Sequence, residues 1–358
     1  EWFLTVSDYL ESLGFVRCVS DPCCFKYVLG NKLIGLISGH VDDFLFCGRD
    51  DCQTWKNLCA QIKQKFQWGT WESDVDGFTQ CGVFIQRMSD GGFELSQKQY
   101  VDDLKEISVS AERRKMMDEE TTEREKSKLR AALGALSWHA QQVGPHVSAA
   151  VSLLLSQVNC SKVRQMIEVN KVIYQVKANR KHVLRVHGGL KIHDMIVAGW
   201  ADASGQNRVD GKSTQGLVVG VTHRDLLRGS MCPVSLVCWQ SAKIGRQCRS
   251  PGATESLAAI DCEDLLYAVR LQLYEMRGGT VYVRRTATHV AQIPSVLVTD
   301  STNVYDRLNN EVYVPKGPER RVALEMVGLK DAITETGLSL RWVNSDAQLA
   351  KIGRASCR

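Results

Sequence analysis

Long apolar runs are absent from this sequence, although 44% of its 358 residues are hydrophobic. No run approaches the roughly 20 consecutive apolar residues that a membrane-spanning helix needs. The succession of charged, apolar and small residues that forms a secretory signal peptide is also missing. The sequence therefore predicts a protein with sizeable hydrophobic cores that is neither membrane-bound nor secreted.

A regular cysteine framework is absent as well. The 13 cysteines are scattered and odd in number, unlike the paired spacing of a disulfide-stapled protein. Cys18, Cys23 and Cys24 cluster without a second ligand pair, so a four-ligand zinc site is not expected there. These patterns favour a reducing, intracellular setting.

Strong charge of one sign is also missing. The formal net charge is +5 and the isoelectric point is about 8.5. A mildly basic chain can bind nucleic acid, but this balance does not require it. The length is enough for two or three domains.

A hairpin pattern is present at residues 32–48, KLIGLISGHVDDFLFCG. Two apolar runs flank a short polar insert that ends in Asp42 and Asp43, which is typical of a β-hairpin. Two adjacent carboxylates repel each other, and Mg²⁺ is the natural cation to offset that repulsion. A solvated turn is the alternative, because Asp is common in turns.

The segments around the hairpin resemble a known family. Glu1-Trp2, SLGF at 12–15, SDPCCF at 20–25 and the hairpin occur in the order seen in the palm of copia-type LTR-retrotransposon reverse transcriptases. His40 stands where that family has Tyr next to Val-Asp-Asp. The resemblance implies that Asp42 and Asp43 are catalytic metal ligands of an RNA-directed DNA polymerase whose first palm aspartate and fingers lie upstream of Glu1.

A second Tyr-Val-Asp-Asp occurs at 100–103, but its surroundings differ. Tyr100, Leu104 and Ile107 recur at helical spacing, and Ser96 with Gln99 has the pattern of a helix start. Asp102 and Asp103 are therefore expected early in a helix, where carboxylates complement the helix dipole.

The middle of the sequence is predicted to be helical. Residues 111–128 are highly charged and indicate a solvated linker or an exposed helix. Residues 129–158 form an apolar helical pattern with a break expected at Gly144-Pro145, and 161–178 continue as another helix. His139 and His146 are expected to be packing or surface residues.

From Asp194 onward the pattern becomes strand-rich. Apolar runs at 195–198, 217–221, 236–240, 296–299 and 338–343 predict five strands, with helices after Ser250 and over 321–334. Asp202 and Asp300 then stand at strand ends, and Glu255 lies in the first turns of a helix. The order resembles the ribonuclease H fold, and GWADASGQNRVDGKSTQG, ATESLAAI, VLVTDSTN and LRWVNSDAQLA resemble its copia-type motifs.

The resemblance implies a metal site at Asp202, Glu255 and Asp300, which match the first three carboxylates of the family. Two Mg²⁺ or Mn²⁺ ions there would activate water against a phosphodiester. Each aspartate alone could instead be a turn or a helix cap. Asp346 could replace the fourth ligand if the chain end bends inward. Further nucleic-acid contacts are expected at Ser204, Ser301, Arg320 and Arg321, with solvated side chains as the alternative.

The expected fold class is mixed α/β (α+β), in three parts followed by a tail. Residues 1–105 are the C-terminal part of a palm, 106–190 a helical thumb or connection, and 194–350 a ribonuclease H-like domain with a five-stranded mixed sheet and flanking helices. Lys351 stands where the family has its fourth carboxylate, and residues 351–358, KIGRASCR, resemble a translated adapter oligonucleotide.

The resemblance implies a retrotransposon fragment that cleaves RNA in RNA–DNA hybrids and carries an incomplete polymerase palm. Its partners would be the RNA–DNA hybrid and a single-stranded RNA template, without a membrane or a small-molecule cofactor beyond nucleotides. It would work in a cytoplasmic particle or the nucleus. The alternative is a decayed fragment that binds nucleic acid without catalysis. A resolvase-like or integrase-like nuclease is a weaker alternative, because GKST, ATES and the palm hairpin argue against it.

Overall fold

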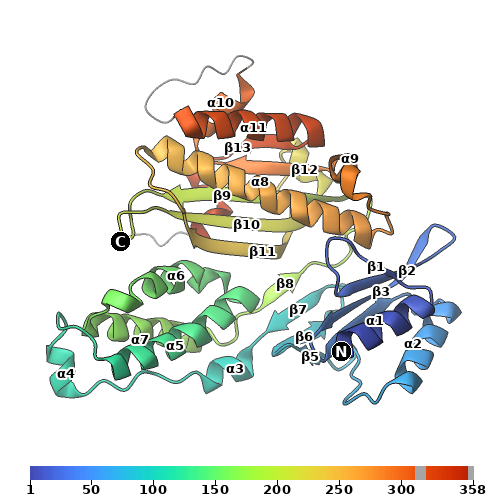
Figure 1. Ribbon diagram of the computed structural model, residues 1–358, viewed down its shortest axis with the longest axis horizontal. Coiled ribbons are helices and arrows are strands. Elements are labelled where there is room, and N and C mark those ends of the chain that lie inside the picture. Colours follow the sequence, from blue (N-terminus) through green and yellow to red (C-terminus); the bar gives the residue numbers. More distant parts are fainter. Residues whose placement is uncertain (311–319, 354–358) are drawn as a thin grey trace.

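The computed structural model describes residues 1–310 and 320–353, and its fold is mixed α/β, as the sequence predicts. Figure 1 shows a small N-terminal sheet region in blue, a group of green helices, and a larger sheet in yellow to red above them. None of the helices in the described ranges is both long and apolar enough to span a bilayer.

The N-terminal sheet has the order β1-β2-β3-β4, and all its neighbours are antiparallel. Val6 and Leu10 of one helix and Trp55 of another pack with strand residues such as Phe25 and Ile37 to form its core. The elements are α1 (Trp2–Ser12), β1 (Val16–Arg17), β2 (Cys24–Leu29), β3 (Lys32–His40), β4 (Asp43–Gly48) and α2 (Gln53–Lys65).

The predicted hairpin is confirmed as β3 and β4. Its register places Gly35 opposite Gly48 and His40 opposite Asp43, which leaves Val41 and Asp42 as the turn. The Trp55 ring covers both glycines, so that a Cβ would lie 2.2 Å from it at Gly35 and 2.1 Å at Gly48. The glycines therefore let α2 pack closely against the hairpin.

A second small sheet joins two segments that lie far apart in the sequence. Its order is β5-β6-β7-β8, all antiparallel. The last strand returns from the end of the segment 106–190 that the sequence predicts to be helical. The strands are β5 (Phe78–Gln80), β6 (Val83–Arg87), β7 (Phe93–Ser96) and β8 (Leu184–Val186).

The second Tyr-Val-Asp-Asp lies in a helix, as predicted, but at its other end. Helix α3 (Lys98–Asp103) starts after Gln97 and ends with Asp102 and Asp103, because Leu104 leaves the helical conformation. The expectation that these carboxylates lie early in the helix is therefore wrong. Asp102 instead pairs with Arg180 at 3.4 Å.

The middle segment is a helical group around one apolar core. Its longest helix begins with a capping box, in which Thr122 and Glu125 satisfy each other's backbone N–H groups. The expected break at Gly144-Pro145 is present. The elements are α4 (Ala111–Lys115), α5 (Glu123–Gln142), η1 (Pro145–Val147), α6 (Ser148–Ser156), η2 (Val158–Cys160) and α7 (Val163–Ala178).

The large sheet has the order β11-β10-β9-β12-β13. Strands β9, β10 and β11 are antiparallel, whereas β12 runs parallel to both β9 and β13. The predicted five-stranded mixed sheet is thus confirmed. The strands are β9 (Met195–Ser204), β10 (Thr214–His223), β11 (Val234–Lys243), β12 (Ser295–Thr299) and β13 (Ser339–Trp342).

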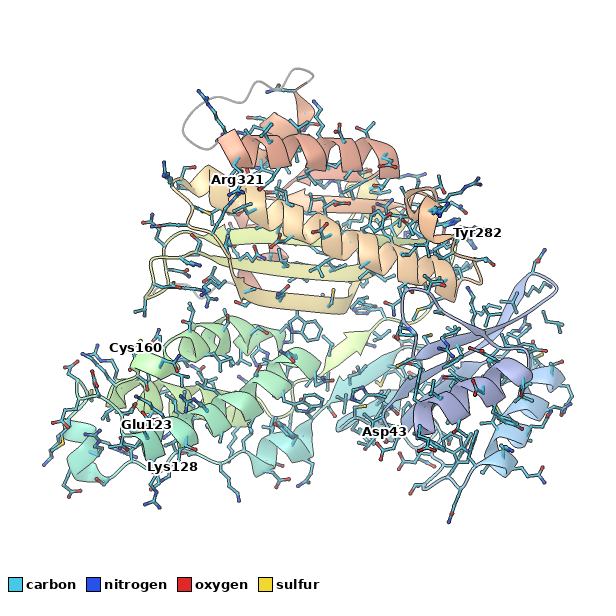
Figure 2. The ribbon with its side chains drawn as sticks, viewed as in Figure 1. Asp43, Glu123, Lys128, Cys160, Tyr282 and Arg321 are labelled. Carbon is cyan, nitrogen blue, oxygen red and sulfur yellow. The ribbon has the colours of Figure 1, made fainter. Side chains whose placement is uncertain are left out.

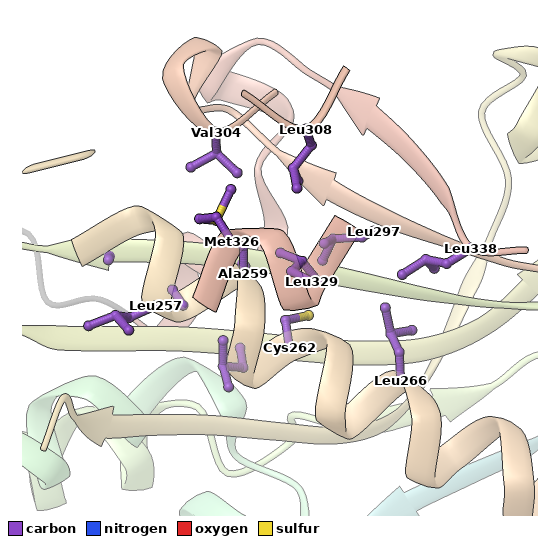
Figure 3. Close-up of a cluster of buried hydrophobic side chains, with 14 of the residues drawn as sticks. Leu257, Ala259, Cys262, Leu266, Leu297, Val304, Leu308, Met326, Leu329 and Leu338 are labelled. Atoms are coloured by element: carbon purple, nitrogen blue, oxygen red, sulfur yellow. The ribbon is translucent and has the colours of Figure 1, made fainter. Parts of the chain in front are cut away.

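Helices cover one face of this sheet and short turns cover the other. Figure 3 shows Cys262 and Leu266 of α8 packed near Leu297, Leu329 and Met326 in the helix-covered core. The helices and turns are η3 (Arg224–Arg228), α8 (Pro251–Met276), η4 (Val283–Arg285), α9 (Thr286–Val290), α10 (Thr302–Asn309), α11 (Arg320–Thr336), η5 (Ser345–Ala347) and η6 (Leu349–Gly353).

Candidate metal centre

Asp202 is placed by the central strand of the large sheet. It lies near the end of β9, which is paired on both sides, and it is only 1% exposed. Its Oδ1 accepts a hydrogen bond of 2.9 Å from the backbone N–H of Ala203. The strand thus holds a carboxylate at the edge of an apolar core, where an unbalanced charge is costly.

Glu255 is placed by the start of α8. Ser250 caps this helix by accepting a bond from Ala253 N–H, and Pro251 occupies its first position. The helix lies close to β9, because a Cβ on Gly199 would lie 2.8 Å from Leu266. This close approach brings the first turns of α8 over the end of β9.

Asp300 follows the last residue of β12. Its Oδ2 accepts a hydrogen bond from the Ser345 hydroxyl, and its backbone carbonyl accepts one of 3.0 Å from Trp342 Nε1. The next residue, Ser301, caps α10. Asp300 is therefore held between a strand end and a helix start, with a second segment of the chain supporting it.

The three carboxylates come together. One oxygen from each of Asp202, Glu255 and Asp300 lies within 4.8 Å of the other two. Such proximity of three carboxylates is unfavourable without a cation. An all-oxygen donor set of this kind suits Mg²⁺ or Mn²⁺ rather than a thiolate-preferring or imidazole-preferring metal. The donor chemistry therefore fits the metal that the sequence predicts.

Asp346 stays outside this group. It is exposed on η5, and its backbone N–H bonds to the side chain of Asn344 at 3.1 Å. Its neighbour Ser345 reaches Asp300 instead, and Lys351 Nζ donates to the backbone carbonyl of Ser345. Within residues 1–310 and 320–353, the carboxylate group has three members. The proposed tail residues 354–358 lie outside the described residues.

The chain end supports β9 through a residue that the sequence analysis missed. Gln348 is 4% exposed and its Nε2 donates to the Ala201 carbonyl at 2.9 Å, next to Asp202. Ser345 was missed for the same reason. A neutral side chain lacks a local signal when its partner lies over 40 residues away, whereas the neighbouring Asp346 attracts attention as a carboxylate.

The hairpin carboxylates lie apart from this group. Asp42 and Asp43 are exposed at the tip of β3 and β4, and Asp43 Oδ2 accepts a bond of 3.2 Å from Cys81 N–H. No third acidic, histidine or cysteine ligand joins them in the part of the chain that the structure describes. Figure 2 shows Asp43 in the N-terminal region, away from the large sheet.

The other expected contact residues have mixed positions. Ser204 is half-buried at the end of β9, close in sequence to Asp202. The Ser301 hydroxyl is occupied as a helix cap, accepting a bond of 3.4 Å from Val304 N–H. Arg320 and Arg321 are exposed at the start of α11 (Figure 2).

Comparisons with known proteins found similar sequences and structures. No family model matches the chain. The chain is 23% identical over 238 residues to the retrovirus-related Pol polyprotein from transposon RE1 of Arabidopsis thaliana. The matched region covers 63% of this chain. The chain spans only 16% of the length of that relative.

Solved structures similar to parts of the chain include two kinds of protein. The RNase H1 from the halophilic archaeon Halobacterium salinarum NRC-1 matches 42% of this chain and 88% of its own, with 15% identity and a TM-score of 0.29. The foamy viral protease-reverse transcriptase in complex with dsDNA matches 86% of this chain and 55% of its own, with 9% identity and a TM-score of 0.43.

Proposed function

We propose that this chain, a relative of the Pol polyproteins of copia-type retrotransposons, is a metal-dependent nuclease that cleaves RNA in RNA–DNA hybrids. The observation that carries the proposal is the convergence of Asp202, Glu255 and Asp300 to within 4.8 Å. They come from a strand, a helix and a second strand end, so that only folding brings them together.

The chain's own residues would hold and orient the reacting groups. Asp202 and Glu255 present carboxylate oxygens from the sheet and from α8, and Ser345 fixes one oxygen of Asp300. Two divalent ions, when bound, would supply an activated water and stabilise the leaving 3′ oxygen of the phosphodiester. Ser204 and Arg321 would contact the nucleic-acid strand near this end of the sheet, and the 2′-OH would mark the RNA strand.

The proposed division of the chain follows its cores. Residues 1–105 would be the C-terminal part of a reverse-transcriptase palm that carries Asp42 and Asp43, 106–190 a connection, and 194–350 the nuclease. Separate buried clusters in the N-terminal sheet, the helical group and the large sheet support three parts, with Val101 and Leu104 at the end of the first segment packing in the helical cluster. The pairing of β8 with β7 ties the end of the connection back to the palm segment.

Metal-dependent cleavage of a labelled RNA–DNA hybrid tests the proposal. The full chain should cleave the RNA strand with Mg²⁺ or Mn²⁺, and Glu255→Gln should reduce cleavage to background because it removes one of the three carboxylates. Glu335→Gln, the same substitution at an exposed site on α11, should behave as the unmodified chain. Equal cleavage by Glu255→Gln and the unmodified chain would contradict the proposal.

One observation favours a second candidate, a nucleic-acid-binding module without catalysis. The Lys351 ammonium donates to the carbonyl of Ser345, the residue whose hydroxyl bonds to Asp300. Lys351 therefore brings a positive charge toward the carboxylate group. Binding of the hybrid without metal-dependent cleavage, both in the unmodified chain and after Lys351→Asp, would support this second candidate over the nuclease.

A further inference from the structure

A cavity of about 620 Å³ lies between the helical group and the large sheet. Its walls come from α5 and α6 on one side, and from β11 and the loop between β9 and β10 on the other. Figure 1 shows α6 alongside β11 at the end of the sheet where β9 stops. Polar lining side chains include Arg208, Lys243, Ser152 and Ser241.

Arg208 is the unusual member of this lining. It is only 8% exposed, and its guanidinium donates to the hydroxyls of Thr214 at 2.9 Å and Ser152 at 2.8 Å. Asp210, two residues further on, forms its ion pair with Lys243 at 3.2 Å. Among the residues that the structure describes, no carboxylate forms an ion pair with Arg208.

A buried guanidinium that bonds only neutral oxygens has no ion-pair partner to offset the cost of burying its charge. Arginine is almost never fully buried without a counter-ion, and burial lowers the pKa of Arg208, while the charge of Asp210 acts in the opposite direction. Two hydroxyls and the Ser152 carbonyl accept three of its N–H bonds, but these neutral oxygens do not balance its charge. An anion in the cavity would supply the missing charge.

Two further polar atoms in this region lack partners among the described residues. They are the hydroxyl of Ser241, a residue that lines the cavity, and the Nδ2 amide of Asn207, a residue that does not, and both atoms are enclosed by protein rather than open to the cavity. Lys243 and Asp210 also line the cavity and form an ion pair at 3.2 Å, so that Arg208 carries the net positive charge of the lining. A guanidinium with neighbouring hydroxyls is typical of sites that bind phosphate oxygens.

The position of the cavity selects the kind of phosphate. Arg208 follows Asp202 by six residues, on the loop that leaves the same end of β9 as the carboxylate group. The volume of the cavity is larger than a single phosphate needs. Two segments of the chain form its walls, as expected for a groove that holds a nucleic-acid backbone. A nucleic-acid backbone approaching the carboxylates from the side of α6 would cross it.

We propose that this cavity binds a backbone phosphodiester of a nucleic-acid strand, with Arg208 as its charged anchor. The proposal rests on the nucleic-acid substrate argued above and deepens it. The helical segment and the large sheet would then grip the strand together, and the interface between them would be part of the binding surface.

The salt dependence of hybrid binding tests the phosphate contact directly. The full chain is titrated with a labelled RNA–DNA hybrid in a chelating buffer, so that no cleavage occurs. One lost phosphate contact reduces the slope of log K against log salt by about 0.9, and weakens binding about tenfold at about 0.1 M salt. We expect these changes for Arg208→Gln and near-normal values for Arg208→Lys, which keeps the charge.

Two control variants separate binding from structure. Arg228→Gln removes an exposed charge on η3, at the other end of β10, and should leave the slope unchanged. Thr214→Val removes a hydrogen bond to Arg208 at a buried residue outside the cavity lining, without changing charge, and should leave the slope unchanged as well. If Thr214→Val and Arg208→Gln weaken binding equally, Arg208 is a structural link between the loop and β10, and the proposal is wrong.

The remaining outcomes distinguish this proposal from the nuclease assignment. An unchanged slope in Arg208→Gln overturns the phosphate site even if cleavage is normal. A reduced slope supports the site even if the chain never cleaves the hybrid. Equal weakening of binding to the hybrid and to an acidic polypeptide would show a general anion site and would also overturn the proposal.

Discussion

Glu275 joins helix α8, which covers the large sheet, to the loop between β1 and β2 of the N-terminal sheet. Its removal should destabilise the protein strongly. It lies near the C-terminal end of α8 and is 1% exposed. Its carboxylate accepts bonds from Val19 N–H at 2.9 Å, Ser20 N–H at 2.7 Å and the Ser20 hydroxyl at 2.5 Å. Lys26, 3% exposed, places its ammonium 3.8 Å away.

The magnitude follows from what Glu275→Ala would leave behind. Two backbone N–H groups would lose their acceptor, and the buried Lys26 ammonium would lose its counter-ion while keeping its bond to the Gly279 carbonyl. Removing one partner of a buried pair costs about 3–5 kcal/mol. Each hydrogen bond to a charged group is worth about 1.5–3 kcal/mol, but contributions from one network do not add. A carboxylate at a helix C-terminus is itself unfavourable, so we expect about 3–4 kcal/mol.

Urea unfolding followed by tryptophan fluorescence measures the change, with Glu335→Ala on the exposed face of α11 as the matched control. The control should alter the free energy of unfolding by less than about 0.5 kcal/mol. Hydrogen exchange at Val19 and Ser20 should become faster in Glu275→Ala alone. A loss below about 1 kcal/mol, with unchanged exchange at these amides, would refute the reasoning.

Other expectations concern a buried histidine and two glycines. Burial lowers the pKa of His139 to about 4 from 6.5, so the unfolded chain binds a proton that the folded chain excludes between these pH values. The free energy of unfolding should therefore fall by at most roughly 3 kcal/mol as pH drops from about 6.5 to about 4. Urea unfolding at several pH values measures this fall, which should be smaller in His139→Gln. Gly48→Ala should destabilise by about 1–3 kcal/mol because its Cβ meets Trp55. Gly134→Ala, in open space within α5, should stabilise the protein by about 0.5–1 kcal/mol and raise the midpoint of thermal unfolding. Stabilisation by Gly48→Ala, or destabilisation by Gly134→Ala, would contradict the packing.

Local patterns were sufficient for the elements that carry the carboxylates. The hairpin of β3 and β4, the five strands of the large sheet and the helix after Ser250 all follow from apolar periodicity and turn residues, and the structure confirms them. The same reasoning was wrong about Asp102 and Asp103, because the helix has only six residues and ends where Leu104 leaves the helical conformation, which places both carboxylates in its last turn.

Long-range contacts were beyond the reach of these patterns. The sequence allowed Asp346 as a fourth ligand on the condition that the chain end bends inward, whereas the structure brings Ser345 to Asp300 and leaves Asp346 exposed. The pairing of β8 with β7 also carries no local signal, because it joins two short strands across the whole helical group.

The sequence by itself determined which residues could form helices and strands, and in what order the acidic residues follow one another, because these depend on neighbours within a few positions. The tertiary structure alone decided that Asp202, Glu255 and Asp300 meet, that Glu275 is enclosed by a loop more than 250 residues away, and that Arg208 lines a cavity between two segments. The physical reason is that burial and charge balance depend on which side chains the packed cores bring into contact.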